Sequence, residues 1–293
     1  MTGKGRRSTI IAMGCGHGAR DRGCADGPAA LCRDGLPRRL RRHARHTSWV
    51  DLTMAAPPDQ AADSVVAEAC DRLAHRVEHE KRQGRFPIVI GGDHSIAVGT
   101  WTGMTRALAA GTEFRLVWID AHMDCHVPQT SPSSALHGMP VACLMGLCHP
   151  RLVAAACPCP ALGPGCIRLV GVRSFEPEEM LLAAHMGVAI ADMAEVTRRG
   201  LAEILAEAAG DGLFGISLDL DAIDPADAPG VGSPVAGGIR GPDLLAALAP
   251  LLASPRCLGL EIAEFNPSHD IDHRTALLVE ALIAAAIQTG GRP

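Results

Sequence analysis

The chain alternates between short apolar runs and longer segments in which apolar residues recur three or four positions apart. The short runs are rich in valine, isoleucine, leucine and phenylalanine, which predicts strands. They cover residues 8–14, 48–53, 86–92, 114–120, 166–172, 187–192, 213–220 and 257–264. Helical spacing between these runs predicts helices, of which the clearest cover residues 61–81, 242–253 and 274–288.

This alternation predicts an α/β fold, a three-layer α/β/α sandwich with a mostly parallel sheet of about eight strands. The runs are continuously apolar, which is typical of central parallel strands covered on both faces. No change in composition divides the chain, so residues 1–293 are expected to form one domain. Residues 121–165 are rich in Pro, Ser, Gly and Cys and predict a functional loop followed by a helix.

Composition argues against large polyanionic partners. The chain has 293 residues, of which 47% are apolar, and 32 acidic against 27 basic groups give a net charge of −5. There is therefore no overall electrostatic reason to bind nucleic acid or an anionic membrane. The basic run at 37–46 lacks stacking aromatic residues and is interpreted as a solvated face. The apolar stretch 277–287 is interrupted by Glu280 and is too short to span a membrane.

Eleven cysteines raise the question of disulfides. The number is odd, the chain is long and we see no secretory signal, so we expect reduced thiols and a cytoplasmic protein. The cluster CPCP at 157–160 lacks the two-residue spacing and the second half of a zinc site. It is interpreted as a loop with incidental thiols.

Polar residues that directly follow predicted strands carry the chemical information, because ligands gather at the carboxyl ends of parallel strands. Such residues occur in GGDHS, DAHMD, SLDLDAIDP and EIAEFNP, at 91–95, 120–124, 217–225 and 261–267. In extended backbone, alternate residues face one side. Asp120, His122 and Asp124 are therefore expected to point together, and so are the aspartates of SLDLD.

Several carboxylates gathered in an interior repel one another unless positive charge lies among them. One or two divalent cations would supply it. Carboxylates and imidazoles without cysteine favour Mn²⁺, Fe²⁺ or Co²⁺ over thiolate-rich zinc. Each residue alone could be a helix cap or a hydrogen-bonded core residue, but three acidic clusters at strand ends argue against independent caps. The six candidate ligands, enough for two ions, are His94, Asp120, His122, Asp124, Asp219 and Asp221.

GGDHS, DAHMD and SLDLDAIDP, in this order, resemble the signatures of the arginase and agmatinase (ureohydrolase) family. The resemblance extends from GARDRGCADGPAAL (18–31) to FNPSHDIDHRTALL (265–278). It implies an arginase-like catalytic domain over residues 1–293 with two Mn²⁺ per subunit. Such a metal-dependent hydrolase of linear amidines converts a guanidinium group to urea and an amine. The resemblance also implies a homo-oligomer, a trimer or hexamer.

The resemblance also implies roles for individual residues. His94, Asp120, Asp124 and Asp219 would hold one ion, and Asp120, His122, Asp219 and Asp221 the other. Asp124 would orient the metal-bound hydroxide that attacks the guanidinium carbon. His137 matches the family's proton-shuttling histidine, for which a mobile imidazole with a pKa near neutral is expected. Glu264 matches the acid that pairs with the guanidinium.

The loop at 126–138 resembles that of arginases more than the shorter agmatinase loop, and Ser133 matches a carboxylate-binding serine. This predicts L-arginine as the substrate and L-ornithine as the product. His126, however, stands where familiar arginases have asparagine, and in GVRSFEPEE Ser174 replaces one acid while Glu176 stands near another. Glu176 could bind the substrate's ammonium group or begin a helix as an N-terminal acid. Peptide-embedded arginine, agmatine or an ω-guanidino acid therefore stays open as the substrate.

Three other functional classes are less consistent with the sequence. GCGHGA (14–19) superficially resembles a nucleotide-binding turn, but its glycine pattern is incomplete. A deacetylase-like metal hydrolase would not explain the three signatures together. A non-catalytic binding subunit stays possible, although all six ligand positions and His137 are present.

Overall fold

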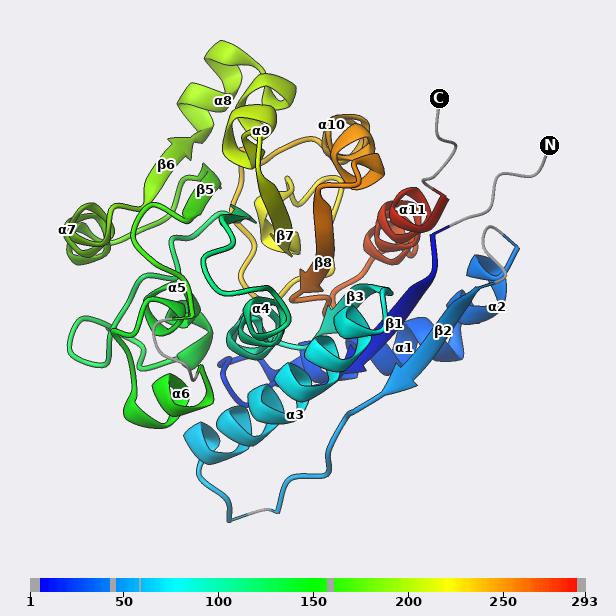
Figure 1. Cartoon of the computed structure of the whole chain (residues 1–293), viewed down its shortest axis with the longest axis horizontal. Helices are drawn as coiled ribbons and strands as arrows, with labels where there is room; N and C mark the ends of the chain where they lie inside the picture. Colours follow the sequence, from blue (N-terminus) through cyan, green and yellow to red (C-terminus); the bar gives the residue numbers. More distant parts are fainter. Residues whose placement is uncertain (1–5, 43–45, 58, 157–160, 289–293) are drawn as a thin grey trace.

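The computed structural model describes residues 6–42, 46–57, 59–156 and 161–288 (Figure 1). All eight predicted strands are present, and they form one parallel sheet in the order β2-β1-β3-β8-β7-β4-β5-β6. Their bounds are β1 Ser8–Met13, β2 Thr47–Asp51, β3 Phe86–Gly91, β4 Phe114–Ile119, β5 Ile167–Val172, β6 Ala189–Asp192, β7 Leu213–Asp219 and β8 Cys257–Ala263.

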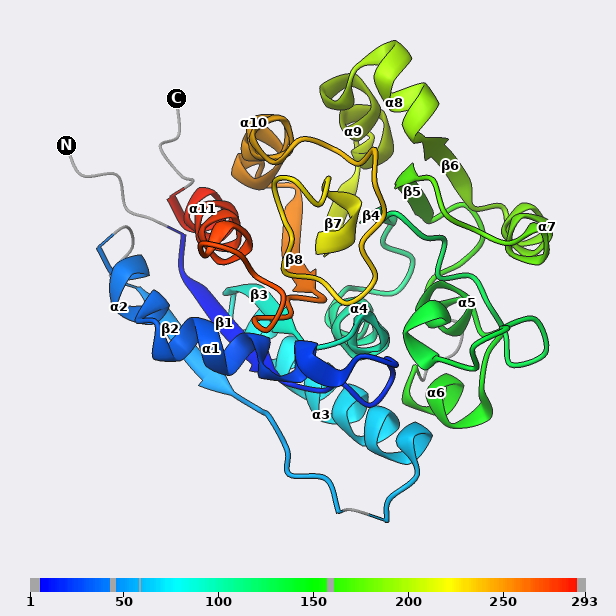
Figure 2. The same cartoon turned by 180° about the vertical axis from the view of Figure 1, so that it is seen from behind.

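Helices cover both faces of the sheet, as Figures 1 and 2 show from opposite sides. One hydrophobic core lies between the sheet and α1 (Gly27–Arg33), α2 (Leu36–Leu40), α8 (Met193–Arg199), α9 (Leu201–Ala209), α10 (Gly241–Ala253) and α11 (Arg274–Gln288). A second core lies on the other face under α3 (Ala62–Arg82), α4 (Ala97–Arg106), α5 (Pro140–Leu144), α6 (Pro150–Ala155) and α7 (Pro177–Met186). The predicted three-layer α/β/α fold is thus confirmed.

The central strands are buried along all or nearly all of their length, whereas the two edge strands are partly exposed. This burial explains why the central runs are continuously apolar in sequence. Strands β3, β8, β7 and β4 are consecutive neighbours in the middle of the sheet. The polar residues that follow these four strands therefore meet above one edge of the sheet.

Helix α4 packs tightly against α3 because two glycines face that helix. A Cβ atom on Gly99 would lie 2.4 Å from the carbonyl oxygen of Cys70, and one on Gly103 would lie 2.3 Å from that of Ala74. These contacts fix the position of α4, which begins directly after η2 (His94–Ile96). The close packing therefore helps to position His94.

The segment at 121–165 is a loop followed by η3 (Leu136–Gly138), α5 and α6, as expected in outline. The expectation of reduced thiols is wrong for one pair, because Cys143 and Cys148 form a disulfide. Helix α5 ends at Leu144, and the turn after it brings the two Cα atoms within 4.6 Å. The CPCP cluster lies outside the described residues.

Two surface expectations can be compared with the structure. In the basic run, the guanidinium of Arg39 lies 2.7 Å from the carboxylate of Glu280, so part of that charge is neutralised by α11. Residues 43–45 of this run lie outside the described residues. Within the described part of the chain, no helix is both long enough and apolar enough to cross a membrane.

Candidate metal centre

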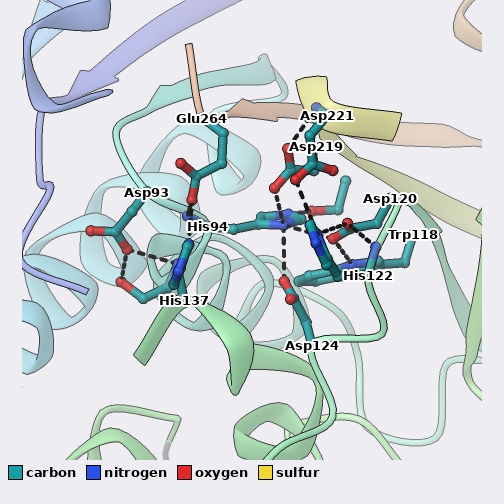
Figure 3. A network of polar contacts seen from close by, with 12 residues as sticks. Asp93, His94, Trp118, Asp120, His122, Asp124, His137, Asp219, Asp221 and Glu264 are labelled. Carbon is teal, nitrogen blue, oxygen red and sulfur yellow. Dashed lines mark hydrogen bonds and ion pairs between the residues drawn. The ribbon is translucent and has the colours of Figure 1, made fainter. Parts of the chain in front are cut away.

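A cluster of buried carboxylates and imidazoles lies at the carboxyl ends of β3, β7 and β4 (Figure 3). His94 follows β3, and Asp219 ends β7, with Asp221 next in η4 (Leu220–Ala222). Asp120, His122 and Asp124 follow β4. The structure thus brings together all six residues proposed from the sequence as metal ligands.

Three carboxylates surround one nitrogen of His94. Its Nδ1 lies 3.1 Å from an oxygen of Asp124 and 3.2 Å from one oxygen each of Asp120 and Asp219. Despite these distances, this buried nitrogen has no hydrogen-bond partner with good geometry among the described residues. Four ligand atoms therefore converge in the manner expected around a cation.

A second group shares one residue with the first. His122 Nδ1 lies 3.0 Å from an oxygen of Asp221 and 3.6 Å from Asp120 Oδ1. Asp120 directs its other oxygen, Oδ2, toward His94. His94, Asp120 and Asp219 are close enough to hold one ion, and Asp120, His122 and Asp221 a second. Asp120 is thus placed to bridge two ions.

The backbone aims these carboxylates in the same way at the ends of two strands. Asp120 Oδ1 accepts a hydrogen bond from the backbone N–H of His122 at 2.7 Å, and Asp219 Oδ1 accepts one from that of Asp221 at 2.8 Å. Two site residues, Asp124 and Glu264, have positive φ angles of 52° and 68°. Such angles are uncommon outside glycine and cluster at functional sites.

Three supporting residues were not predicted from the sequence. Trp118 donates a hydrogen bond from Nε1 to Asp120 at 2.9 Å, and its ring stacks on His94 with 4.1 Å between centroids. On the other side of His94, Nε2 lies 3.0 Å from Ser217 Oγ, which donates to Glu261 at 3.1 Å. Trp118 and Ser217 each precede a metal-ligand candidate by two positions, and this same-face spacing was the available signal.

The electrostatics of the cluster indicate an excess of negative charge. Burial, together with Asp120, raises the pKa of Asp124 to about 7. Burial also raises the pKa of Asp219 well above its usual value, and that of Asp221 moves in the same direction. Burial would also raise the pKa of Asp120, but His122 and His94 outweigh burial and lower this pKa. Asp124, Asp219 and Asp221 thus bind their protons more tightly than usual, because too few cations surround them.

The same carboxylates favour the charged forms of the two histidines. Burial alone would lower the pKa of His94, but the three carboxylates around it raise the value well above normal. In the same way, Asp221 and Asp120 outweigh burial and raise the pKa of His122 to about 12. Oxygen and imidazole donors without a thiolate suit hard or borderline divalent cations. The residues present therefore fit a binuclear metal site.

His137 and Glu264 form an ion pair beside this cluster. His137 Nδ1 lies 2.9 Å from Glu264 Oε1, which also accepts a hydrogen bond from the backbone N–H of His94 at 2.9 Å. Burial would lower the pKa of His137, but Glu264 raises it to about 10. This value lies above the near-neutral pKa expected from the sequence, because motif spacing does not reveal the contact with Glu264, which lies 127 residues further along the chain.

A cavity of about 310 Å³ opens from the cluster toward the head-group residues proposed from the sequence, and His126, Ser133 and Glu176 line it. His126 Nε2 lies 3.1 Å from Glu176 and 3.4 Å from Glu179. Glu176 also caps α7, in a capping box with Glu179, so the helix-start interpretation is confirmed. Ser133 Oγ accepts a hydrogen bond from the backbone N–H of Ala135 at 3.1 Å.

Ser174, which replaces one of the acids discussed from the sequence, lies away from this cavity. Ser174 is not among the lining residues, and its backbone N–H donates to the carbonyl oxygen of Ala121 at 3.0 Å. The neighbouring Arg173 guanidinium donates to the carbonyl oxygens of Asp221 and Val235, both at 2.7 Å. Residues 173–174 thus act structurally, by tying the loop after β5 to the ends of β4 and β7.

The comparison with known proteins agrees with this geometry. The sequence pattern of the arginase family matches residues 6–288. The arginase of Bacillus caldovelox is 35% identical over 94% of this chain and 96% of its own length. Among solved structures, arginase from Entamoeba histolytica has a TM-score of 0.89 at 28% identity, covering 98% of this chain and 99% of that one. Arginase from Bacillus subtilis has a TM-score of 0.86 at 31% identity, covering 98% and 100%.

Proposed function

The chain belongs to the arginase family of hydrolases, and on that premise we propose that it hydrolyses the guanidinium group of L-arginine to urea and L-ornithine. The observation that carries the proposal is the convergence of three carboxylates on His94 Nδ1 at 3.1–3.2 Å. The His137–Glu264 pair lies directly beside that point. We further propose that residues 1–293 form one catalytic domain. The homo-oligomeric state and the cytoplasmic location stay predictions.

We propose two Mn²⁺ ions as the cofactors. His94, Asp120, Asp124 and Asp219 would hold one, and Asp120, His122, Asp219 and Asp221 the other. The split of the two Asp120 oxygens between His94 and His122 supports a shared ligand, and the donor types fit manganese. When bound, such ions supply Lewis acidity and lower the pKa of a coordinated water molecule.

Three residues would then act on the reactants. Asp124 would accept a hydrogen bond from the attacking water and fix its direction. Glu264 would accept hydrogen bonds from the guanidinium and orient its carbon toward that water. The departing amine needs a proton, because an alkylamide anion cannot leave. Glu264 raises the pKa of His137, which favours the protonated imidazole that can donate this proton.

His126, Ser133 and Glu176 are proposed to bind the head group of the substrate. One observation favours a second candidate. Glu176 already contacts His126 and caps α7, which reduces its capacity to bind an additional ammonium group. A guanidino compound without an α-ammonium group, such as an ω-guanidino acid, is therefore the alternative substrate.

The test is urea release by Mn²⁺-loaded protein offered L-arginine, agmatine, 4-guanidinobutyrate and an arginine-containing peptide side by side. Preference for L-arginine would support the proposal. Urea release from one of the other compounds but not from L-arginine would support the proposed reaction and contradict the proposed substrate. No urea from any of them, with metal bound, would leave a binding subunit as the better interpretation.

A further inference from the structure

Two cavities meet above the metal centre. One contains Asp124, Asp219 and Asp221, and the other contains Glu264. The residues that line both are Arg20, Ser133, His137 and Ser233. Arg20 therefore stands at the junction through which a substrate would reach both the proposed metal ligands and Glu264.

Arg20 carries an uncompensated charge at this junction. Its side chain is exposed, and within the described part of the chain it has no ion pair or side-chain hydrogen bond. Among the described residues lining the first cavity it is the one arginine or lysine, and five carboxylates line the same space. Those carboxylates belong to Asp124, Glu176, Glu179, Asp219 and Asp221. A ligand with an anionic end is therefore attracted to the guanidinium of Arg20.

The backbone on both sides of Arg20 is held in place. The N–H of Gly18 donates to Asp93 at 2.8 Å, and its carbonyl oxygen accepts from the backbone N–H of His137 at 3.2 Å. Gly18 can approach so closely because it has no Cβ, which would lie 2.5 Å from Asp93 Oδ1. On the other side, Asp21 Oδ2 lies 2.7 Å from His269 Nε2. The loop thus fixes the Cα of Arg20 while leaving its guanidinium available.

We propose that Arg20 binds the carboxylate of the substrate, assisted by the hydroxyl groups of Ser133 and Ser233. The proposal rests on the proposed function and narrows its substrate class to guanidino acids over guanidino amines. A guanidinium can hold a carboxylate through two parallel hydrogen bonds, which gives orientation as well as attraction. Arg20 was not identified from the sequence, because nothing in the stretch 18–31 indicates that its side chain meets the cavity.

The first test compares L-arginine with agmatine, which has the same guanidinium but no carboxylate. In Arg20→Ala, the ratio of kcat/KM for L-arginine to kcat/KM for agmatine should fall about tenfold. The fall should come from a higher KM for L-arginine. Arg22→Ala is the matched control, because Arg22 is an exposed arginine of the same loop that lines neither cavity. An unchanged ratio in Arg20→Ala, or an equal fall in Arg22→Ala, would overturn the proposal.

A binding measurement separates this proposal from the proposed function. L-ornithine and putrescine differ by the carboxylate alone, and calorimetry on Mn²⁺-loaded protein requires no turnover. Arg20→Ala should weaken the binding of L-ornithine about tenfold relative to the binding of putrescine. Arg20→Lys should bind L-ornithine more tightly than Arg20→Ala does. That result without urea release would support the role of Arg20 and reject the proposed reaction. Urea release with unchanged L-ornithine binding in Arg20→Ala would reject the role of Arg20 alone.

Discussion

Replacing Asp124 by asparagine should stabilise the metal-free protein, although it removes a proposed metal ligand. Burial and the Asp120 carboxylate raise the pKa of Asp124 from 3.8 to about 7. An acid with a raised pKa in the folded state binds its proton more tightly there than in the unfolded chain. The stability of the metal-free protein therefore falls as pH rises from about 4 to about 7, and the full penalty applies above pH 7.

The size of this penalty follows from the shift. About three pH units at about 1.4 kcal/mol each correspond to about 4 kcal/mol. An unfolding entropy of about 2.1 cal/mol/K per residue gives about 0.6 kcal/mol/K for this chain. Asparagine cannot ionise, so Asp124→Asn should raise the Tm of the metal-free protein by about 7 °C at pH 8. Near pH 4 the difference should vanish, because both side chains are then uncharged.

The assay is thermal unfolding with a chelator present, at pH 4, 6 and 8, followed by the same scans with Mn²⁺ added. Manganese should raise the Tm of the wild-type protein through preferential binding to the folded state, and should raise that of Asp124→Asn less. Asp211→Asn, a substitution at an exposed position before β7, is the control. A metal-free Asp124→Asn protein that melts at or below the wild type at pH 8 would refute the idea that crowded carboxylates destabilise this centre.

Three further outcomes are expected. A chelator should abolish urea release, and added Mn²⁺ should restore it; activity that survives complete metal removal would contradict a metal-dependent reaction. His137→Ala should slow turnover but leave metal content intact, because the His137 imidazole contacts Glu264 rather than a proposed ligand side chain. Metal loss equal to that of Asp124→Asn would count against a role of His137 in proton donation. Turnover should fall at high pH, once His137 loses the proton that Glu264 stabilises, and a profile of kcat against pH that stays level from 8 to 11 would exclude this group as the acid.

The strands could be predicted from sequence because burial on both faces imposes a continuous apolar pattern. Every predicted run contains a strand, and differences are confined to one or two residues at most ends. Helix α3 is likewise recognisable from its apolar spacing and begins at Ala62, one residue from the expected start. The disulfide between Cys143 and Cys148 could not be predicted, because it depends on the path by which the turn after α5 brings Cys148 back to that helix. No local pattern encodes that path.

The candidate ligands were also accessible from sequence, since alternate residues after a strand share one side. The protonation state of His137 was not, because it depends on Glu264, which lies 127 residues further along the chain. The contact between His126 and Glu176 was not accessible either, because it spans 50 residues. Sequence spacing therefore identifies groups carried by one strand end, whereas pKa values and head-group contacts depend on which loops meet.

The metal centre concentrates features that would destabilise a protein if they stood alone. It contains buried carboxylates, the orphaned nitrogen of His94, and positive φ angles at Asp124 and Glu264. Each non-glycine residue in such a conformation costs about 1–3 kcal/mol. The fold can hold them because the strands that carry them are fixed by apolar cores on both faces. The two strained residues lie beyond strand ends, Glu264 directly after β8 and Asp124 in the loop that follows β4. A cation at His94 would relieve the repulsion between the carboxylates but not the backbone strain, which these cores must hold in either state.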